Sequence, residues 1–127
     1  MKNTEMMLRS LVGPVRIKIK PIAVAVEVAE ELMFDQSMDR DDIYVTKHVY
    51  PMVASRLGIT QAAATRSIER AANLCLAPSN VQRLEKLVGR RLNCINAPSD
   101  IIFYLAYYRR FGRSYYEVIE KMPCLMF

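Results

Sequence analysis

Apolar side chains recur every three to four positions along most of this chain, which is the period of helices that bury one face. Prolines, glycines and capping residues interrupt the pattern at intervals typical of helices in globular proteins. We therefore predict an all-α fold. The predicted helices cover residues 4–12, 22–34, 60–77, 81–88, 101–111 and 115–121, with one further segment that begins at Ile43 and is interrupted or kinked at Pro51. Candidate N-caps are Asn3 or Thr4, Ser99 with Asp100, and Ser114.

The acidic side chains between residues 27 and 42 are predicted to lie on the surface. The helical period places Glu27, Glu30 and Glu31 outside the apolar face of the second helix. The acidic cluster that follows predicts either helix caps, with Asp41 or Asp42 capping the third segment, or a solvated acidic turn. This cluster consists of Asp35, Asp39, Asp41 and Asp42.

One stretch alternates apolar and basic residues with the period of a strand. Residues 15–20 read Val-Arg-Ile-Lys-Ile-Lys and lie between Pro14 and Pro21. Because a proline cannot donate a ladder hydrogen bond, this stretch suits an extended connector or an edge ribbon better than a central strand. Pro21 also suits the first turn of the helix that follows.

Residues 53–60, Val-Ala-Ser-Arg-Leu-Gly-Ile-Thr, have the chemistry of a helix-turn-helix. Ala54 is small enough for two helices to cross closely, and Gly58, four positions later, tolerates the positive φ of a tight turn. Leu57 and Ile59 are then expected to fill the angle between the helices. Thr60 is the predicted N-cap of the second helix.

The helix predicted over residues 60–77 has one apolar and one polar side. Its apolar stripe, Ala64, Ile68, Ala71 and Cys75, recurs at i, i+4, i+7 and i+11. On the other side, small and polar residues come first and arginines follow, as a recognition helix needs if its first turns enter the major groove and its cations reach phosphates. The alternative is a helical hairpin with no role in DNA binding. The candidate DNA-binding residues are Thr60, Gln61, Ala62, Ala63, Thr65, Arg66, Glu69, Arg70 and Asn73.

The charge of the chain suits an anionic partner, although net charge alone does not define a function. Eighteen basic and thirteen acidic residues among 127 leave a formal charge of +5. Residues 1–42 hold six basic and eight acidic side chains (−2), and residues 43–127 hold twelve and five (+7). We therefore expect the second part to bind any polyanion. Arg90, Arg91, Arg109, Arg110 and Arg113 either contact phosphates too or simply lie exposed at helix ends.

Two segments carry a resemblance to a known family. His48-Val49-Tyr50-Pro51-Met52-Val53-Ala54 and the Thr-Gln-Ala-Ala-Ala-Thr-Arg-Ser-Ile-Glu-Arg-Ala run of residues 60–71 resemble the C-terminal effector domain of the sporulation-initiation response regulator of endospore-forming bacteria. That family has a Tyr-Pro-x-Ile/Val-Ala helix before a recognition helix of Val-Glu-Arg-Ala-Ile-Arg type. Val88-Gly89 and residues 97–102 also correspond, so the resemblance covers about residues 11–111. It implies a domain of about six helices around a helix-turn-helix, which binds duplex DNA through the helix of residues 60–77, often as a tandem pair.

This chain departs from the family at the positions that read bases. Ala63 stands where the family has a base-reading arginine, Thr65 where it has glutamate and Glu69 where it has its final arginine, while Arg66 matches the middle arginine. Because alanine cannot replace a bidentate contact to guanine, worth about 1–3 kcal/mol of discrimination, we expect a different operator or weak specificity. The family also carries a phosphoacceptor receiver domain, for which 127 residues leave no room unless the chain is a fragment.

Other kinds of function find no support in the sequence. No nucleophile–base set, phosphate-binding glycine loop or carboxylate pair is present, so we expect no enzymatic activity, cofactor or small-molecule substrate. Cys75, Cys94 and Cys124 show neither disulfide nor zinc spacing, and His48 has no ligand partner at helical spacing, so no metal site is predicted. Free cysteines and the lack of a signal peptide or apolar span predict a cytoplasmic protein.

We predict a single domain over residues 1–127, in which residues 1–10 and 114–127 are peripheral or form an interface. The apolar end, residues 123–127, is expected to cover the core or a second subunit, so a homodimer is possible. Tyr104, Tyr107, Tyr108, Tyr115 and Tyr116 are expected to pack in the core or between subunits. The predicted function is DNA-binding transcriptional regulation, and the alternative is a protein-interaction module or antagonist on the same fold.

Overall fold

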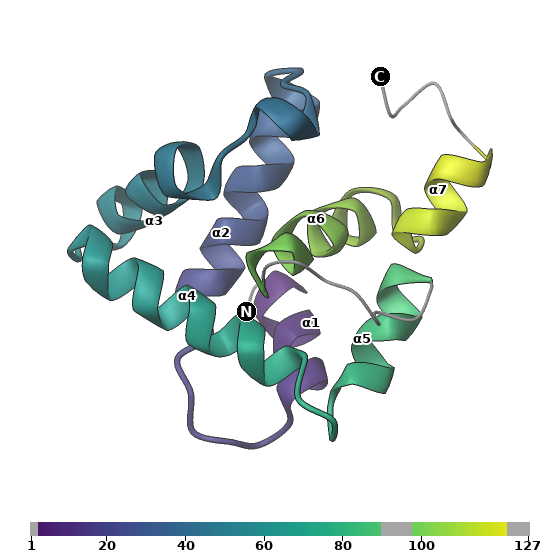
Figure 1. Cartoon of the computed structure of the whole chain (residues 1–127), viewed down its shortest axis with the longest axis horizontal. Helices are drawn as coiled ribbons and strands as arrows, with labels where there is room; N and C mark the ends of the chain where they lie inside the picture. The colour runs from purple at the N-terminus through teal and green to yellow at the C-terminus, as the bar shows by residue number, and fades with distance from the viewer. Residues whose placement is uncertain (1–2, 90–97, 122–127) are drawn as a thin grey trace.

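The computed structural model describes residues 3–89 and 98–121, and within these ranges the secondary structure is helical, without a strand (Figure 1). This confirms the all-α fold class. The α-helices are α1 (Asn3–Val12), α2 (Lys20–Glu30), α3 (Tyr50–Leu57), α4 (Gln61–Cys75), α5 (Val81–Val88), α6 (Ile101–Phe111) and α7 (Tyr115–Lys121). Short helical turns cover Glu31–Asp35, Arg40–Asp42, Val45–Val49 and Pro98–Asp100.

Helix α2 lies at the centre of the fold and packs against α1, α3, α4 and α6 (Figure 1). Its residues from Pro21 to Glu30 are buried, except for Glu27, which is partly exposed. A helix that is apolar on all sides is stable only inside a protein. The Ile-Ala-Val-Ala-Val run of residues 22–26 is apolar on all sides and is buried. Pro21 occupies the first turn, as predicted.

The predicted exposure of Glu30 is wrong, since this residue is only 8% exposed. Its carboxylate accepts a hydrogen bond from the guanidinium of Arg109 in α6. Arg109 Nε also donates to the hydroxyl of Thr4 in α1, which is fully buried, over 2.6 Å. The helical period could not place Glu30 correctly because α2 has no exposed side and because the partner of Glu30 comes from a distant part of the chain. Through these two contacts Arg109, whose side chain is itself 36% exposed, links α1, α2 and α6.

The segment between α2 and α3 begins and ends differently from the prediction. The α-helical part of the second predicted helix stops at Glu30, and a π-helical turn, Glu31–Asp35, replaces its last residues. Asp35, the last residue of this turn, is exposed, as are Asp39, Asp41 and Asp42 after it. Neither Asp41 nor Asp42, which belong to the short turn Arg40–Asp42, caps the turn Val45–Val49 that leads into α3. Of the two predictions, the solvated acidic turn is therefore correct. Instead of a carboxylate, His48 Nδ1 accepts a hydrogen bond from the Tyr44 backbone N–H at 2.9 Å.

Aromatic rings join α6, α7 and the turn after α2. Tyr115 meets Tyr104 and Tyr107 edge to face, with ring centroids 4.9 and 5.0 Å apart. Phe34 packs in the same way on Tyr107, at 5.1 Å. Ser114 caps α7, as predicted, because its hydroxyl accepts a hydrogen bond from the Glu117 N–H at 3.2 Å. These tyrosines therefore pack within the domain, in agreement with the prediction that they pack in the core or between subunits.

We expect the folded chain to lose stability at alkaline pH because several of its tyrosines are wholly or partly buried. Burial raises the pKa of Tyr50, Tyr104, Tyr107 and Tyr115 above the ordinary value of 10.0. The unfolded chain then releases these protons at lower pH than the folded chain, so the stability that they support is complete below about pH 10 and is lost as the pH rises through the folded pKa values. We expect part of the tyrosinate absorbance to appear only together with loss of the helical circular dichroism signal. Full ionisation of all tyrosines in a still-folded chain would contradict this.

Candidate nucleic-acid interface

A tight turn joins α3 to α4, and its geometry agrees with the roles predicted for Gly58 and Thr60. Gly58 has φ +66° and ψ +35°, the left-handed conformation that glycine adopts at little cost. The N–H of Ile59 donates to the carbonyl of Ala54 over 3.0 Å and closes the end of α3. The hydroxyl of Thr60 accepts a hydrogen bond from the Ala63 N–H at 3.1 Å, which caps α4.

The role predicted for Ile59 is wrong, because its side chain remains 38% exposed and does not fill the angle between α3 and α4. Leu57 is partly buried against the core, as expected. The fully buried side chains of the two helices include Val53 in α3 and Ala64 and Ile68 in α4, so the packing of α3 on α4 is complete without Ile59. Ile59 instead lines a shallow groove that faces the segment before α2.

Alanine at position 58 tests the turn. A Cβ atom added to Gly58 would meet nothing within 4 Å, so the cost of Gly58→Ala is the positive φ alone. We expect Gly58→Ala to lower the free energy of unfolding by about 1–2 kcal/mol, and Gly58→Asn to lower it less, because asparagine tolerates this conformation. Urea unfolding followed by circular dichroism measures both. Equal losses for the two variants would mean that φ is not what the turn requires.

The buried and exposed sides of α4 agree with the sequence pattern. Ala64, Ile68, Ala71 and Cys75 are at most 1% exposed, and Ala72 joins them. The helix spans Gln61–Cys75, slightly less than predicted, with Thr60 as its N-cap. Among the candidate residues, Thr60, Gln61, Ala62, Arg66, Glu69, Arg70 and Asn73 are exposed, and Ala63 and Thr65 are partly buried. Helix α4 thus presents the candidate residues at the surface, where the amide of Gln61 also donates to the Thr46 carbonyl at 3.2 Å.

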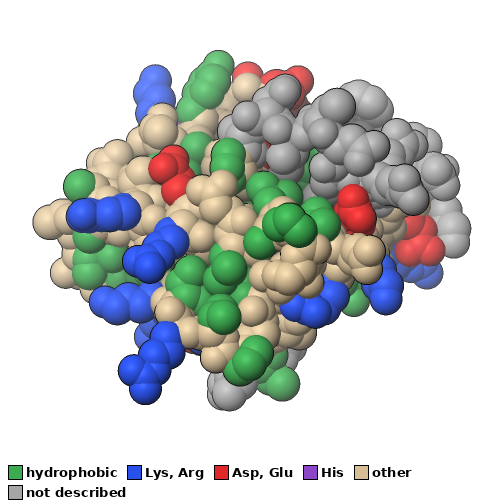
Figure 2. All heavy atoms as spheres, turned by 60° about the horizontal axis from the view of Figure 1, so that its bottom comes forward, with side chains coloured by type: hydrophobic (Ala, Val, Ile, Leu, Met, Phe, Trp, Pro, Cys, Tyr) green, Lys and Arg blue, Asp and Glu red, His purple; other side chains and the backbone are tan. Residues whose placement is uncertain are grey.

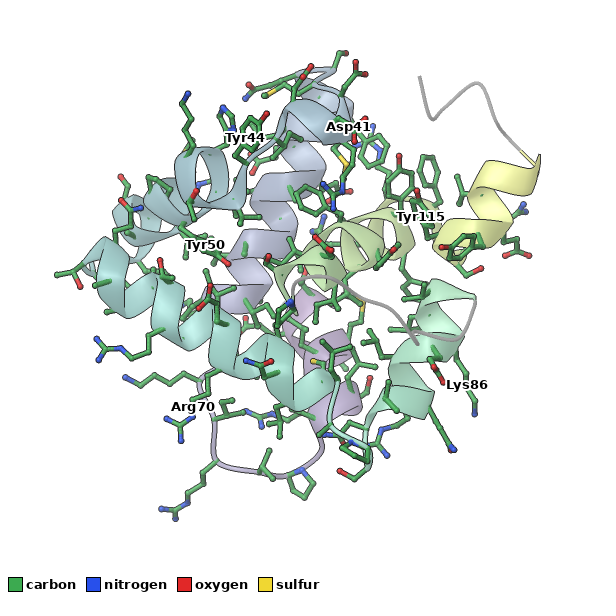
Figure 3. The ribbon with its side chains drawn as sticks, viewed as in Figure 1. Asp41, Tyr44, Tyr50, Arg70, Lys86 and Tyr115 are labelled. Carbon is green, nitrogen blue, oxygen red and sulfur yellow. The ribbon has the colours of Figure 1, made fainter. Side chains whose placement is uncertain are left out.

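The exposed side of α4 has two flanks of different charge. Ala63, Arg66, Ser67 and Arg70 follow one another at helical spacing and line a groove of about 380 Å³. Glu69 lies on the other flank, on the side of Tyr50, whose pKa is raised by burial and, to a smaller extent, by this carboxylate. In Figure 3, Tyr50 and Arg70 lie on opposite sides of the α4 ribbon. Any polyanion is therefore favoured on the flank that carries Arg66 and Arg70.

The opposite wall of this groove is formed by a segment that the sequence-based prediction did not include. Arg16, Ile17 and Lys18, from the connector between α1 and α2, face the arginine flank of α4. Neither these two cations nor Arg66 and Arg70 form an ion pair with a residue that the structure describes. Figure 2, in which the bottom of Figure 1 comes forward, shows Lys and Arg side chains gathered over this part of the surface. Four cations therefore meet at one groove.

The net charge of −2 over residues 1–42 concealed the contribution of Arg16 and Lys18 to the groove. The alternation of apolar and basic residues over residues 15–20 did indicate that these cations share one side of the segment. In the structure this stretch is a loop without regular secondary structure, so it connects α1 to α2 as predicted but curves around the Arg9 guanidinium and is not extended. The alternation is retained, because Ile19 is buried and Ile17 partly buried while Arg16 and Lys18 are exposed. An alternating pattern that is typical of a strand here separates the core-facing side of a loop from its solvent-facing side.

Two of the other predicted basic residues are bound within the fold. Arg109 is bound to Glu30, and Arg110 forms an ion pair with Asp35 at 3.3 Å, so these arginines hold the fold together. Arg113 is exposed. Arg90 and Arg91, like Cys94, Cys124 and residues 123–127, lie outside the described residues. The groove between α4 and the connector is therefore the strongest candidate for binding an anion.

Metal and thiol chemistry receives no positive support from the described part of the chain. Within it, no group of three or more His, Cys, Asp or Glu side chains could hold a metal ion. Burial raises the pKa of Cys75 to about 11, so this thiol stays protonated near neutral pH. Among the described helices, none is long and apolar enough to cross a membrane.

Comparison of the chain with protein-family models, with curated proteins and with solved structures finds no match. The case for a function therefore rests on the residues of this chain and on their geometry.

Proposed function

We propose that this chain binds double-stranded DNA through α4, which enters the major groove as a recognition helix, and that it acts as a cytoplasmic, non-enzymatic transcriptional regulator of the sporulation-effector type. The observation that carries the proposal is the exposed side of α4, where Arg66 and Arg70 have no ion-pair partner among the described residues and face further cations. A capped helix after a left-handed glycine turn, with cations directed to solvent, is the arrangement that helix-turn-helix proteins use.

The order of residues along α4 suits an approach to DNA with the helix N-terminus first. Ala62 and Ala63 are small, so the first turns can come close to base edges, and the hydroxyl of Thr65 can donate to or accept from a base. Arg66 and Arg70 lie further along the helix, where long cations reach the phosphates. Because only a few of these groups read bases, we expect a modest preference for one operator over other sequences.

Titration of the chain with a labelled duplex over a series of salt concentrations tests the proposal. We expect binding at low salt, with log K falling linearly with log salt by about 0.9 for each phosphate contacted. A set of duplexes of random sequence, enriched by repeated selection on the protein, would define the operator. Absence of duplex binding at low salt would overturn the proposal.

A second candidate function, a protein-interaction module on the same fold, is favoured by apolar side chains that are exposed in α3 and in the segments before and after it. Ile59 is 38% exposed, Met52 in α3 is 40% exposed and Tyr44 is 60% exposed. This candidate predicts a partner bound with weak salt dependence and no duplex binding. The same salt series therefore separates the two candidates. Size-exclusion chromatography with light scattering tests the proposed homodimer independently.

A further inference from the structure

We infer that the connector between α1 and α2, residues 13–19, is a second DNA-contacting element that binds the sugar–phosphate backbone beside the groove that α4 enters. This inference rests on the proposed function. DNA binding through α4 would be possible without the connector, so the contact by the connector is an additional one. Helix α4 accounts for sequence preference, whereas the connector adds affinity that does not depend on sequence.

The first argument is the position of the cations. Arg16 and Lys18 form one wall of the 380 Å³ groove and Arg66 and Arg70 the other, and no acidic side chain lines it. Phosphates along a DNA strand are regularly spaced single charges, so a groove with cations on both walls suits them better than it suits a compact ligand. In Figure 3, Arg70 projects from α4 toward the side on which the connector runs.

The second argument is the way in which α1 holds the connector in place. The guanidinium of Arg9 donates to the carbonyls of Gly13 (3.3 Å), Val15 (2.8 Å) and Ile17 (3.3 Å). One planar cation therefore binds the carbonyls of three alternate residues, so the connector curves around the guanidinium and is held in place. Because the loop is ordered before any ligand arrives, its ordering costs little at the moment of binding.

The third argument is the side on which the cations lie. Ile19 is buried and Ile17 packs against the core, so the alternate residues Arg16 and Lys18 are directed to solvent. A cation held on a fixed backbone and directed away from the core gains free energy when it neutralises a phosphate and releases a counterion. Nothing in this arrangement reads a base edge, so the contact is expected to be independent of sequence.

The variant Arg16→Ala/Lys18→Ala tests the inference in the full chain. We expect its affinity for duplex DNA to fall about tenfold at low salt and the slope of log K against log salt to become shallower by about 1.8, the value for two phosphate contacts. The loss should be the same for a preferred and an unrelated duplex, so their affinity ratio stays constant. The matched control is Lys86→Ala/Arg113→Ala, which removes the same charges from exposed positions in α5 and after α6. Lys86 lies far from Arg70 in Figure 3.

The outcomes separate this inference from the proposed function. If the wild-type chain binds duplex DNA but the connector variant loses no more affinity than the control, the inference is overturned and the proposed function stands. A fall in the affinity ratio would also overturn it, because the connector would then read sequence. If the wild-type chain binds only single-stranded RNA or an acidic peptide, and no duplex, both proposals fail together.

A third variant, Arg9→Lys, tests whether the connector must be held in place. Lysine keeps the charge but cannot bind three carbonyls with a planar fork, so the connector should loosen. We expect weaker duplex binding with an unchanged salt slope, since the number of phosphate contacts is preserved. Wild-type affinity in a variant whose connector amides exchange hydrogen faster would contradict this part of the inference.

Discussion

The variant Arg66→Ala/Arg70→Ala should bind duplex DNA about 100-fold more weakly than the wild-type chain at low salt. We expect each arginine to contribute about a factor of ten, which corresponds to 1.4 kcal/mol. Both side chains lie on the flank of α4 that faces the connector, and neither forms an ion pair with a described residue, so their removal costs no interaction within that part of the domain. Fluorescence anisotropy with a labelled duplex measures the effect.

Two controls separate loss of contact from loss of charge and loss of fold. Lys86→Ala/Arg113→Ala lowers the net charge by the same amount at exposed positions elsewhere and should weaken binding much less. The stability of the Arg66→Ala/Arg70→Ala variant should stay within about 0.5 kcal/mol of wild type, since both positions are exposed and alanine favours helices. Glu69→Gln removes a negative charge from the opposite flank and should strengthen binding slightly. Wild-type affinity in the double arginine variant would exclude α4 as the DNA-binding helix.

The parts of the structure that the sequence predicted well are those determined by neighbouring residues. Helix α4 is an example, since its apolar spacing, the N-cap hydroxyl of Thr60 and the left-handed Gly58 act within a few residues of one another. The same holds for α7 and its cap, Ser114. Local chemistry was therefore sufficient to place the candidate residues on one exposed surface.

The features that the sequence could not predict depend on contacts between distant segments. The burial of Glu30 depends on Arg109, 79 positions later in the chain. Arg16 and Lys18 reach the flank of α4 because Arg9 holds the curved connector in place, and no local pattern shows where such a loop runs. A charge sum over consecutive residues hid this contribution, because most of the acidic side chains that offset it lie elsewhere in the fold, although Glu5 lines the adjoining groove.

The second large effect is expected on stability, from the ion pair in the core. Arg109→Met leaves the Glu30 carboxylate, whose side chain is 10% exposed, with Arg110 at 4.0 Å as the remaining cation within ion-pair distance among the described residues. Removing one partner of a buried pair typically costs 3–5 kcal/mol. Because the Arg109 side chain is itself 36% exposed, we expect about 2–4 kcal/mol here, a large part of the 5–15 kcal/mol that stabilises a typical domain. Urea unfolding followed by circular dichroism measures this loss.

Replacement of both partners should be far less harmful than replacement of one. In Glu30→Met/Arg109→Met no charge is left without a partner in the core, so most of the lost stability should return. The exposed pair of Arg56 and Glu31, 2.8 Å apart with side chains 40% and 42% exposed, provides the control, and Arg56→Met should cost less than about 1 kcal/mol. If the double variant were as unstable as Arg109→Met, the cost would come from lost packing or from the Thr4 hydrogen bond instead of from a carboxylate buried without its partner. The burial of Glu30 would then be a consequence of the fold, and the ion pair would not be what holds α1, α2 and α6 together.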